Sequence, residues 1–115
     1  MKETAKLFKA LSEEVRLRVL GLLMHGELCV CDLMEVLDLP QSTISRHLSY
    51  LANAGWISGE RRGVWMYYRF REDGGELQQE MLAVLSRHLA VLPAVARDHE
   101  RLAQYLKTRR TCACC

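Results

Sequence analysis

The period of the hydrophobic pattern changes at Gly55, and this change constrains the fold more than any other feature of the sequence. Residues 41–55 (QSTISRHLSYLANAG) place their apolar side chains at spacings of four and three, which is one face of a helix: Ile44, Leu48 and Leu51. Residues 56–60 and 64–70 instead favour strands. Because Gly55 is a typical helix stop and residues 61–63 (RRG) predict a short turn, a helix should lead directly into a β-hairpin.

More helices are expected upstream. A short leading helix should precede a buried helix at residues 15–24, for which Ser12 is the expected N-cap. A shorter helix follows at about 30–37, and Pro40 separates it from the next helix. Helix, turn, helix and hairpin are the order of a winged helix-turn-helix, so the fold should be mainly α with a β wing. Residues 41–53 would be its recognition helix.

A long helix is predicted from about residue 76 to residue 106. It carries a near-heptad seam, which favours pairing with another helix: Met81, Leu85, His88, Leu92, Val95, His99, Leu102 and Leu106. Pro93 should kink or split this helix. We therefore expect one domain over residues 1–106, followed by a cysteine-rich tail at 107–115.

Residue types suited to DNA gather on the predicted recognition helix and wing. The candidates for base edges or phosphates are Gln41, Ser42, Thr43, Ser45, Arg46 and His47. Arg61 and Arg62 should meet phosphates or the minor groove from the wing tip. An amphipathic surface helix with ordinary polar residues is the alternative for 41–55 alone, and the complete order of elements favours double-stranded DNA as the partner.

Composition sets limits on location and chemistry. The chain has 115 residues, half of them apolar, and a formal charge of only +2, so DNA binding must rest on local charge. The N-terminus lacks the apolar core of a signal peptide, and no apolar run approaches the roughly 18 residues of a membrane span. We expect a cytoplasmic protein without a membrane partner, in which five cysteines are ion ligands or redox centres.

Two of these cysteines, Cys29 and Cys31, are one residue apart at the expected start of the 30–37 helix. On a regular helix, side chains two residues apart point about 200° away from each other. Both thiols would then reach one ion only if the first turn bends. One hypothesis is that the ion favours a bent helix start and DNA a regular one, so that each weakens binding of the other.

Residues 10–70 resemble the ArsR/SmtB family of metal- and metalloid-responsive repressors. The resemblance rests on ELCVCDL (27–33), STISRHLSYLANAGWI (42–57) and RRGVWMYYRF (61–70). It implies a homodimer, paired through its first and last helices, on an inverted-repeat operator. It also implies that an inducer binds Cys29 and Cys31, because ELCVCDL resembles the arsenic-, antimony-, cadmium- and lead-sensing members.

The third ligand departs from the pattern of the arsenic-type members. Met34 stands where they carry a third cysteine, and the sequence offers Cys112, Cys114 and Cys115 instead. One of these should complete a site with the first two cysteines for As(III) or Sb(III); a site formed by the tail alone is the other arrangement. Four thiolates would also suit Cd(II), Pb(II) or Zn(II). Cadmium- and lead-type members usually add N-terminal cysteines, and none precedes Cys29.

Other hypotheses about the function explain less of the sequence. The positions that resemble the family's zinc site hold Ser86, His88, His99 and Leu102, which leaves two ligands only, so both histidines are interpreted as polar positions of the seam. A thiol redox switch is possible, but acidic neighbours give Cys29 and Cys31 little thiolate character. An arsenic carrier would leave the wing unexplained. No cofactor loop or Ser/His/Asp set is present, so no enzymatic activity is expected.

Overall fold

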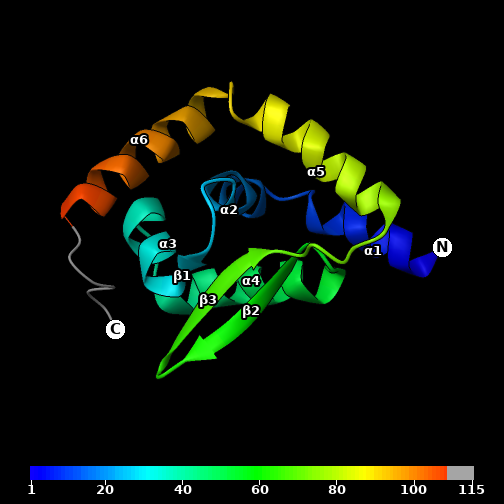
Figure 1. Cartoon of the computed structure of the whole chain (residues 1–115), viewed down its shortest axis with the longest axis horizontal. Helices are drawn as coiled ribbons and strands as arrows, with labels where there is room; N and C mark the ends of the chain where they lie inside the picture. The colour runs from blue at the N-terminus through cyan, green and yellow to red at the C-terminus, as the bar shows by residue number, and fades with distance from the viewer. Residues whose placement is uncertain (109–115) are drawn as a thin grey trace.

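Six helices and a three-stranded antiparallel sheet make up the part of the chain that the computed structural model describes, residues 1–108 (Figure 1). The arrangement is a winged helix-turn-helix, as the sequence predicts. The elements are α1 (Lys2–Ala10), α2 (Glu14–Leu23), β1 (Leu28–Cys29), α3 (Val30–Leu37), α4 (Gln41–Ala54), β2 (Ile57–Arg62), β3 (Trp65–Phe70), α5 (Glu76–Leu89) and α6 (Pro93–Thr108).

The core lies between α2, α3 and α4, and the apolar stripe of α4 faces it as expected. Its largest fully buried side chains include Leu20, Leu22, Leu33, Ile44, Leu48, Leu51 and Trp56. The Trp56 indole N–H donates to the Leu7 carbonyl oxygen at 2.9 Å, which fixes α1 against the start of the wing. Gly55 ends α4 with φ +99°, a left-handed conformation that glycine adopts without strain.

The expected N-cap of α2 is wrong by one residue. Glu13, not Ser12, is the N-cap, and its carboxylate accepts from the backbone N–H of Arg16 at 3.1 Å. Ser12 instead donates its hydroxyl to the Lys9 carbonyl oxygen at 2.7 Å. The reason is that α1 ends immediately before, so the serine hydroxyl satisfies a carbonyl group of its last turn.

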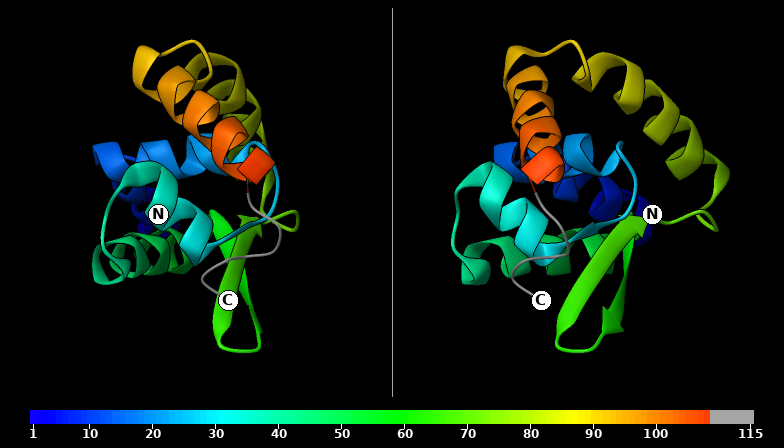
Figure 2. Two further views of the ribbon diagram at one scale, coloured as in Figure 1. Left: turned by 90° about the vertical axis from the view of Figure 1, so that its left-hand side faces the viewer. Right: turned by 60° about the vertical axis from the view of Figure 1, so that its left-hand side comes forward.

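The wing contains one strand more than the sequence indicates. β3 is the central strand, between β2 and the two-residue β1, and all pairs are antiparallel. The turn is also shifted: Arg61 and Arg62 lie on β2, and the loop is Gly63-Val64. Gly63 has φ +65°, which suits the tight turn of a two-residue hairpin. Figure 2 shows the β2–β3 hairpin projecting beyond the helices.

The long C-terminal helix is split at Pro93, as predicted, into α5 and α6, which form an arch over α2 (Figure 1). The seam is consequently not one stripe. Val95 and Leu102 are buried within their own subunit, whereas His88 and Leu92 are exposed. None of the helices within residues 1–108 is long and apolar enough to cross a membrane.

Two polar contacts fasten α6 to α2. Arg18 binds the buried carboxylate of Asp98 through two hydrogen bonds of 2.8 and 2.9 Å. His99 Nε2 lies 2.7 Å from the Gly21 carbonyl oxygen. A methyl group at Gly21 would approach Val95 Cγ1 to 2.9 Å, so the glycine lets the two helices pack this closely. The last helix therefore belongs to the core of its own subunit.

Candidate thiol site and nucleic-acid interface

The sulfur atoms of Cys29 and Cys31 already lie side by side. Cys29 ends β1 and is the N-cap of α3, with the extended angles φ −78° and ψ 153°. Cys31 lies in the first helical turn, and its sulfur lies 2.7 Å from the Cys29 sulfur. The expectation that convergence requires a bent helix is therefore wrong, because only one of the two cysteines has helical geometry.

The two sulfurs are close enough to share one ion after a small movement. Two sulfurs that bind one ion at about 2.3 Å with a tetrahedral angle lie about 3.8 Å apart. The observed separation is 2.7 Å, so the sulfurs must move apart by about 1 Å, without unwinding α3. Thiolates are the ligands that soft ions prefer. Cys29 and Cys31 are 0% and 4% exposed, and such burial disfavours a bare thiolate more than an ion-bound one.

Asp32 holds this turn in place. Its buried carboxylate accepts from the Cys29 backbone N–H at 2.8 Å, while the Cys29 sulfur accepts from the Cys31 backbone N–H at 3.4 Å. Together they form a reciprocal capping box at the start of α3. Sequence reasoning missed this role of Asp32, although the three-residue spacing of Cys29 and Asp32 was a usable signal.

The other proposed ion ligands fall into two groups. Cys112, Cys114 and Cys115 lie outside the described residues. His88 is exposed on α5, and His99 is engaged with α2 through the contact described above. Within residues 1–108, no three His, Cys, Asp or Glu side chains are grouped so as to hold a metal ion.

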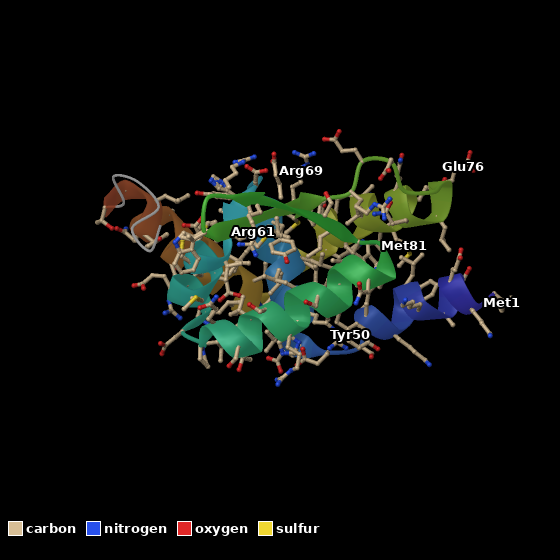
Figure 3. All side chains as sticks on the ribbon, turned by 90° about the horizontal axis from the view of Figure 1, so that it is seen from below. Met1, Tyr50, Arg61, Arg69, Glu76 and Met81 are labelled. Atoms are coloured by element: carbon tan, nitrogen blue, oxygen red, sulfur yellow. The ribbon has the colours of Figure 1, made fainter. Side chains whose placement is uncertain are left out.

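The N-terminal part of α4 presents most of its predicted DNA-binding residues to solvent. Gln41, Ser42 and Arg46 are exposed, and Thr43 and Ser45 are half-buried. Figure 3 looks onto this face, with Tyr50 of α4 and Arg61 of the wing labelled. His47 is only 8% exposed, so the structure does not present this predicted DNA-binding side chain to solvent. It follows Ile44 by three residues and therefore shares the buried face of α4.

His47 packs instead against the start of α2. Its Nδ1 lies 3.4 Å from a carboxylate oxygen of Glu13, and no hydrogen bond to Nδ1 occurs within residues 1–108. Burial lowers the pKa of His47; the Glu13 charge opposes this shift, and Arg16 and Arg46 reinforce it. The recognition helix thus rests on α2 through a histidine whose burial disfavours its protonated form.

We predict that acid destabilises the fold through His47. Above its ordinary pKa of 6.5, the imidazole is neutral in both the folded and the unfolded chain. As pH falls below 6.5, the unfolded chain binds a proton that the folded chain resists, so the free energy of unfolding decreases. Urea unfolding at pH 7.5 and 5.5 should show this loss, and a smaller one in His47→Gln. His88→Gln, at an exposed histidine of α5, should behave like the wild type; an equal loss in all three proteins would contradict the assignment.

On the wing, the guanidinium of Arg62 forms ion pairs with two carboxylates. Its guanidinium donates to Glu27 at 2.7 and 3.0 Å and to Glu60 at 2.7 Å, and lies 4.7 Å from the centre of the Tyr67 ring. These carboxylates, first Glu27 and then Glu60, raise the pKa of Arg62. Arg61 is exposed and forms no ion pair within residues 1–108. Arg61 is therefore the better placed of the two for phosphates.

Arg16 is a positioning residue that the sequence reasoning missed. Its Nε donates to the Ala10 carbonyl oxygen at 2.7 Å, and its guanidinium lies 4.1 Å from the centre of the Tyr50 ring. Arg16 thus ties the end of α1 and the start of α2 to the recognition helix. No local pattern signals such a contact, because Tyr50 lies far along the chain.

Comparison with known proteins agrees with this geometry. Residues 13–58 match the family described as bacterial regulatory protein, arsR family. The arsenical resistance operon repressor of Escherichia coli (strain K12) is 37% identical over 97 residues, covering 74% of this chain and 83% of the repressor. A cadmium resistance transcriptional regulatory protein, the CadC homolog of Staphylococcus aureus, is 36% identical over 72 residues, covering 62% of this chain and 60% of that protein.

A solved structure extends the likeness to the fold. The homodimeric winged helix-turn-helix DNA-binding domain of a possible ArsR-family transcriptional regulator from Mycobacterium bovis superposes with a TM-score of 0.65 at 28% identity. The match covers 81% of this chain and 84% of that domain. Sequence motifs, wing topology and these relatives lead to one conclusion: the chain belongs to the ArsR family of bacterial transcriptional regulators.

Proposed function

We propose that this ArsR-family protein is a homodimeric repressor that leaves its operator when As(III) or Sb(III) binds Cys29 and Cys31. The observation that carries the proposal is the pair of buried sulfurs 2.7 Å apart where β1 meets α3. The arsenical resistance repressor among its relatives supports the choice of ion. The third thiolate would come from Cys112, Cys114 or Cys115, whether of the same or the partner subunit.

The DNA-binding surface would consist of α4 and the wing. Gln41, Thr43, Ser45 and Arg46 would approach base edges in the major groove, and Ser42 and Arg61 would bind phosphates. In a dimer, two copies of α4 would lie about one DNA turn apart and match an inverted repeat.

Exposed apolar side chains support a partner subunit. Phe8 of α1 and Leu77 and Val84 of α5 each expose 40% or more of their surface. They belong to the first helix and to the first half of the split last helix, which the family resemblance assigns to dimer contacts. The homodimeric domain from Mycobacterium bovis is consistent with such an assembly.

A second candidate is the same repressor with Cd(II), Pb(II) or Zn(II) as inducer, which the cadmium resistance relative favours. Fluorescence anisotropy of the reduced protein on DNA from upstream of its own gene distinguishes the two. Release by arsenite at concentrations where cadmium has little effect supports the proposal. Release by cadmium alone would assign the site to a four-thiolate metal, and release only on oxidation would assign it to a redox switch.

We predict that Arg61→Ala weakens binding to all DNA sequences about equally. Loss of one phosphate contact should reduce the slope of log K against log salt by about one. The control is Arg97→Ala, which removes an exposed arginine of α6, on the far side of α2 from α4 (Figure 1). Salt titrations should leave the control's slope near that of the wild type. A loss confined to one operator sequence would instead make Arg61 a base reader.

A further inference from the structure

The sheet joins the cysteine pair directly to the wing. Cys29 pairs with Tyr67 of β3, and Tyr67 pairs with Glu60 of β2, so these three residues form one row across the three strands. Residues paired across a sheet point to the same face, as do residues two apart on one strand. Arg62 follows Glu60 by two residues and therefore lies on the face of that row.

Ion pairs connect the residue before β1 to the two wing strands. Glu27, two residues before Cys29, accepts both hydrogen bonds from Arg62 of β2 and lies 3.8 Å from Arg69 of β3. Its side chain is 27% exposed, the most sheltered of this group of charges. A single carboxylate next to the thiol pair thus holds both strands of the wing.

We propose that Glu27 and Arg62 transmit inducer binding from Cys29 and Cys31 to the wing. The inference rests on the proposed function and names the coupling route within it. An ion shared by the two cysteines must move their sulfurs apart from 2.7 Å. Because the Cys29 sulfur and backbone N–H are both engaged in the α3 capping box, this movement repositions the short strand β1. Glu27 moves with β1, and its ion pair with Arg62 shifts β2 in the same direction. The wing is then displaced from the position in which it can bind DNA together with α4.

This route replaces the bent helix as the physical link. The bent helix would act through α3 on α4, whereas the structure connects the thiol pair to the wing without distorting a helix. Glu27 and Arg62 are positioning residues in this scheme, since neither has to contact the ion. Binding of ion and DNA would then favour different wing positions, which is the condition for negative coupling.

The test compares Glu27→Gln with Asp73→Asn. Each substitution removes one carboxylate charge and one bidentate arginine contact near the sheet, so the net charge and its attraction for DNA change equally. Glu27→Gln also removes the 3.8 Å contact with Arg69 of β3. Within residues 1–108, Asp73 pairs only with Arg71 and makes no contact with β1. It is therefore a matched control for the loss of an exposed ion pair.

The first measurement is the Kd for operator DNA in the presence of arsenite divided by the Kd in its absence, both under reducing conditions. A high ratio means that arsenite releases the DNA. Glu27→Gln should lower this ratio by about 2- to 5-fold, the factor expected for one exposed ion pair, and Asp73→Asn should keep the wild-type ratio. Arsenite affinity without DNA should be the same in all three proteins. A wild-type ratio in Glu27→Gln would overturn the inference and leave the proposed function standing.

The second measurement needs no DNA. Amide hydrogen exchange of residues 57–62 should change when arsenite is added to the wild type and to Asp73→Asn, and should stay constant in Glu27→Gln. If arsenite changes the exchange of residues 57–62 in this pattern but does not release the operator, the proposed function is contradicted and the coupling is supported. An arsenite response limited to α3 and α4, with no change in β2, would refute the coupling itself.

Discussion

Replacing Cys29 or Cys31 by serine will leave operator binding intact and abolish its release by arsenite. Each substitution replaces one of two adjacent soft sulfur ligands by a hydroxyl, and the one cysteine that remains cannot hold the ion by itself. The wild-type change in operator affinity, about 5- to 150-fold for an ordinary allosteric coupling, should fall to about onefold. Anisotropy titrations with arsenite measure both quantities.

The serine variants should fold normally. Cys29 is the N-cap of α3, and serine is among the best residues for that position. Its hydroxyl can accept the Cys31 N–H bond that the sulfur accepts now. Retained release in either variant would contradict the proposed site. Single substitutions of Cys112, Cys114 and Cys115 then identify the third ligand, since only the ligating cysteine should be needed for release.

Truncating Leu102 to alanine should cost about 2–5 kcal/mol of unfolding free energy, the range for a buried leucine. Leu102 is 3% exposed and belongs to the hydrophobic core. Leu92→Ala is the matched control, because the same atoms are removed from a side chain that is 47% exposed. It should change stability by no more than about 0.5 kcal/mol.

Both variants belong to the seam that the sequence predicts as one stripe. Urea unfolding must be compared at a single protein concentration, because dimerisation adds to apparent stability. A large loss for Leu102→Ala alone confirms that α6 packs on its own subunit. Equal losses for the two variants would show that the seam faces a partner along its whole length.

Local patterns predicted the helices well. The 30–37 helix, the end of the recognition helix at Gly55 and the break at Pro93 depend on residues close together in the chain, and the structure confirms all three. β1 was missed because a two-residue strand has no pattern of its own. It exists through its pairing with β3, about forty residues later.

The structure differs from the sequence-based predictions at the site for the same reason. Arg62 was expected at phosphates because the sequence does not reveal that Glu27, 35 residues away, would bind it. His47 was expected at DNA because its side-chain chemistry is suitable, but its place on the helix buries it beside α2. The two thiols were expected to diverge because Cys29 was treated as helical, whereas the N-cap position turns its sulfur toward Cys31.

X-ray absorption at the arsenic edge, on reduced protein with one equivalent of arsenite, tests most directly whether the ion is held by the adjacent thiols. We predict a first shell of sulfur in the wild type, and fewer sulfur neighbours in Cys29→Ser and in Cys31→Ser. An unchanged sulfur shell in the double variant Cys29→Ser/Cys31→Ser would place the ion elsewhere and contradict the proposed inducer site.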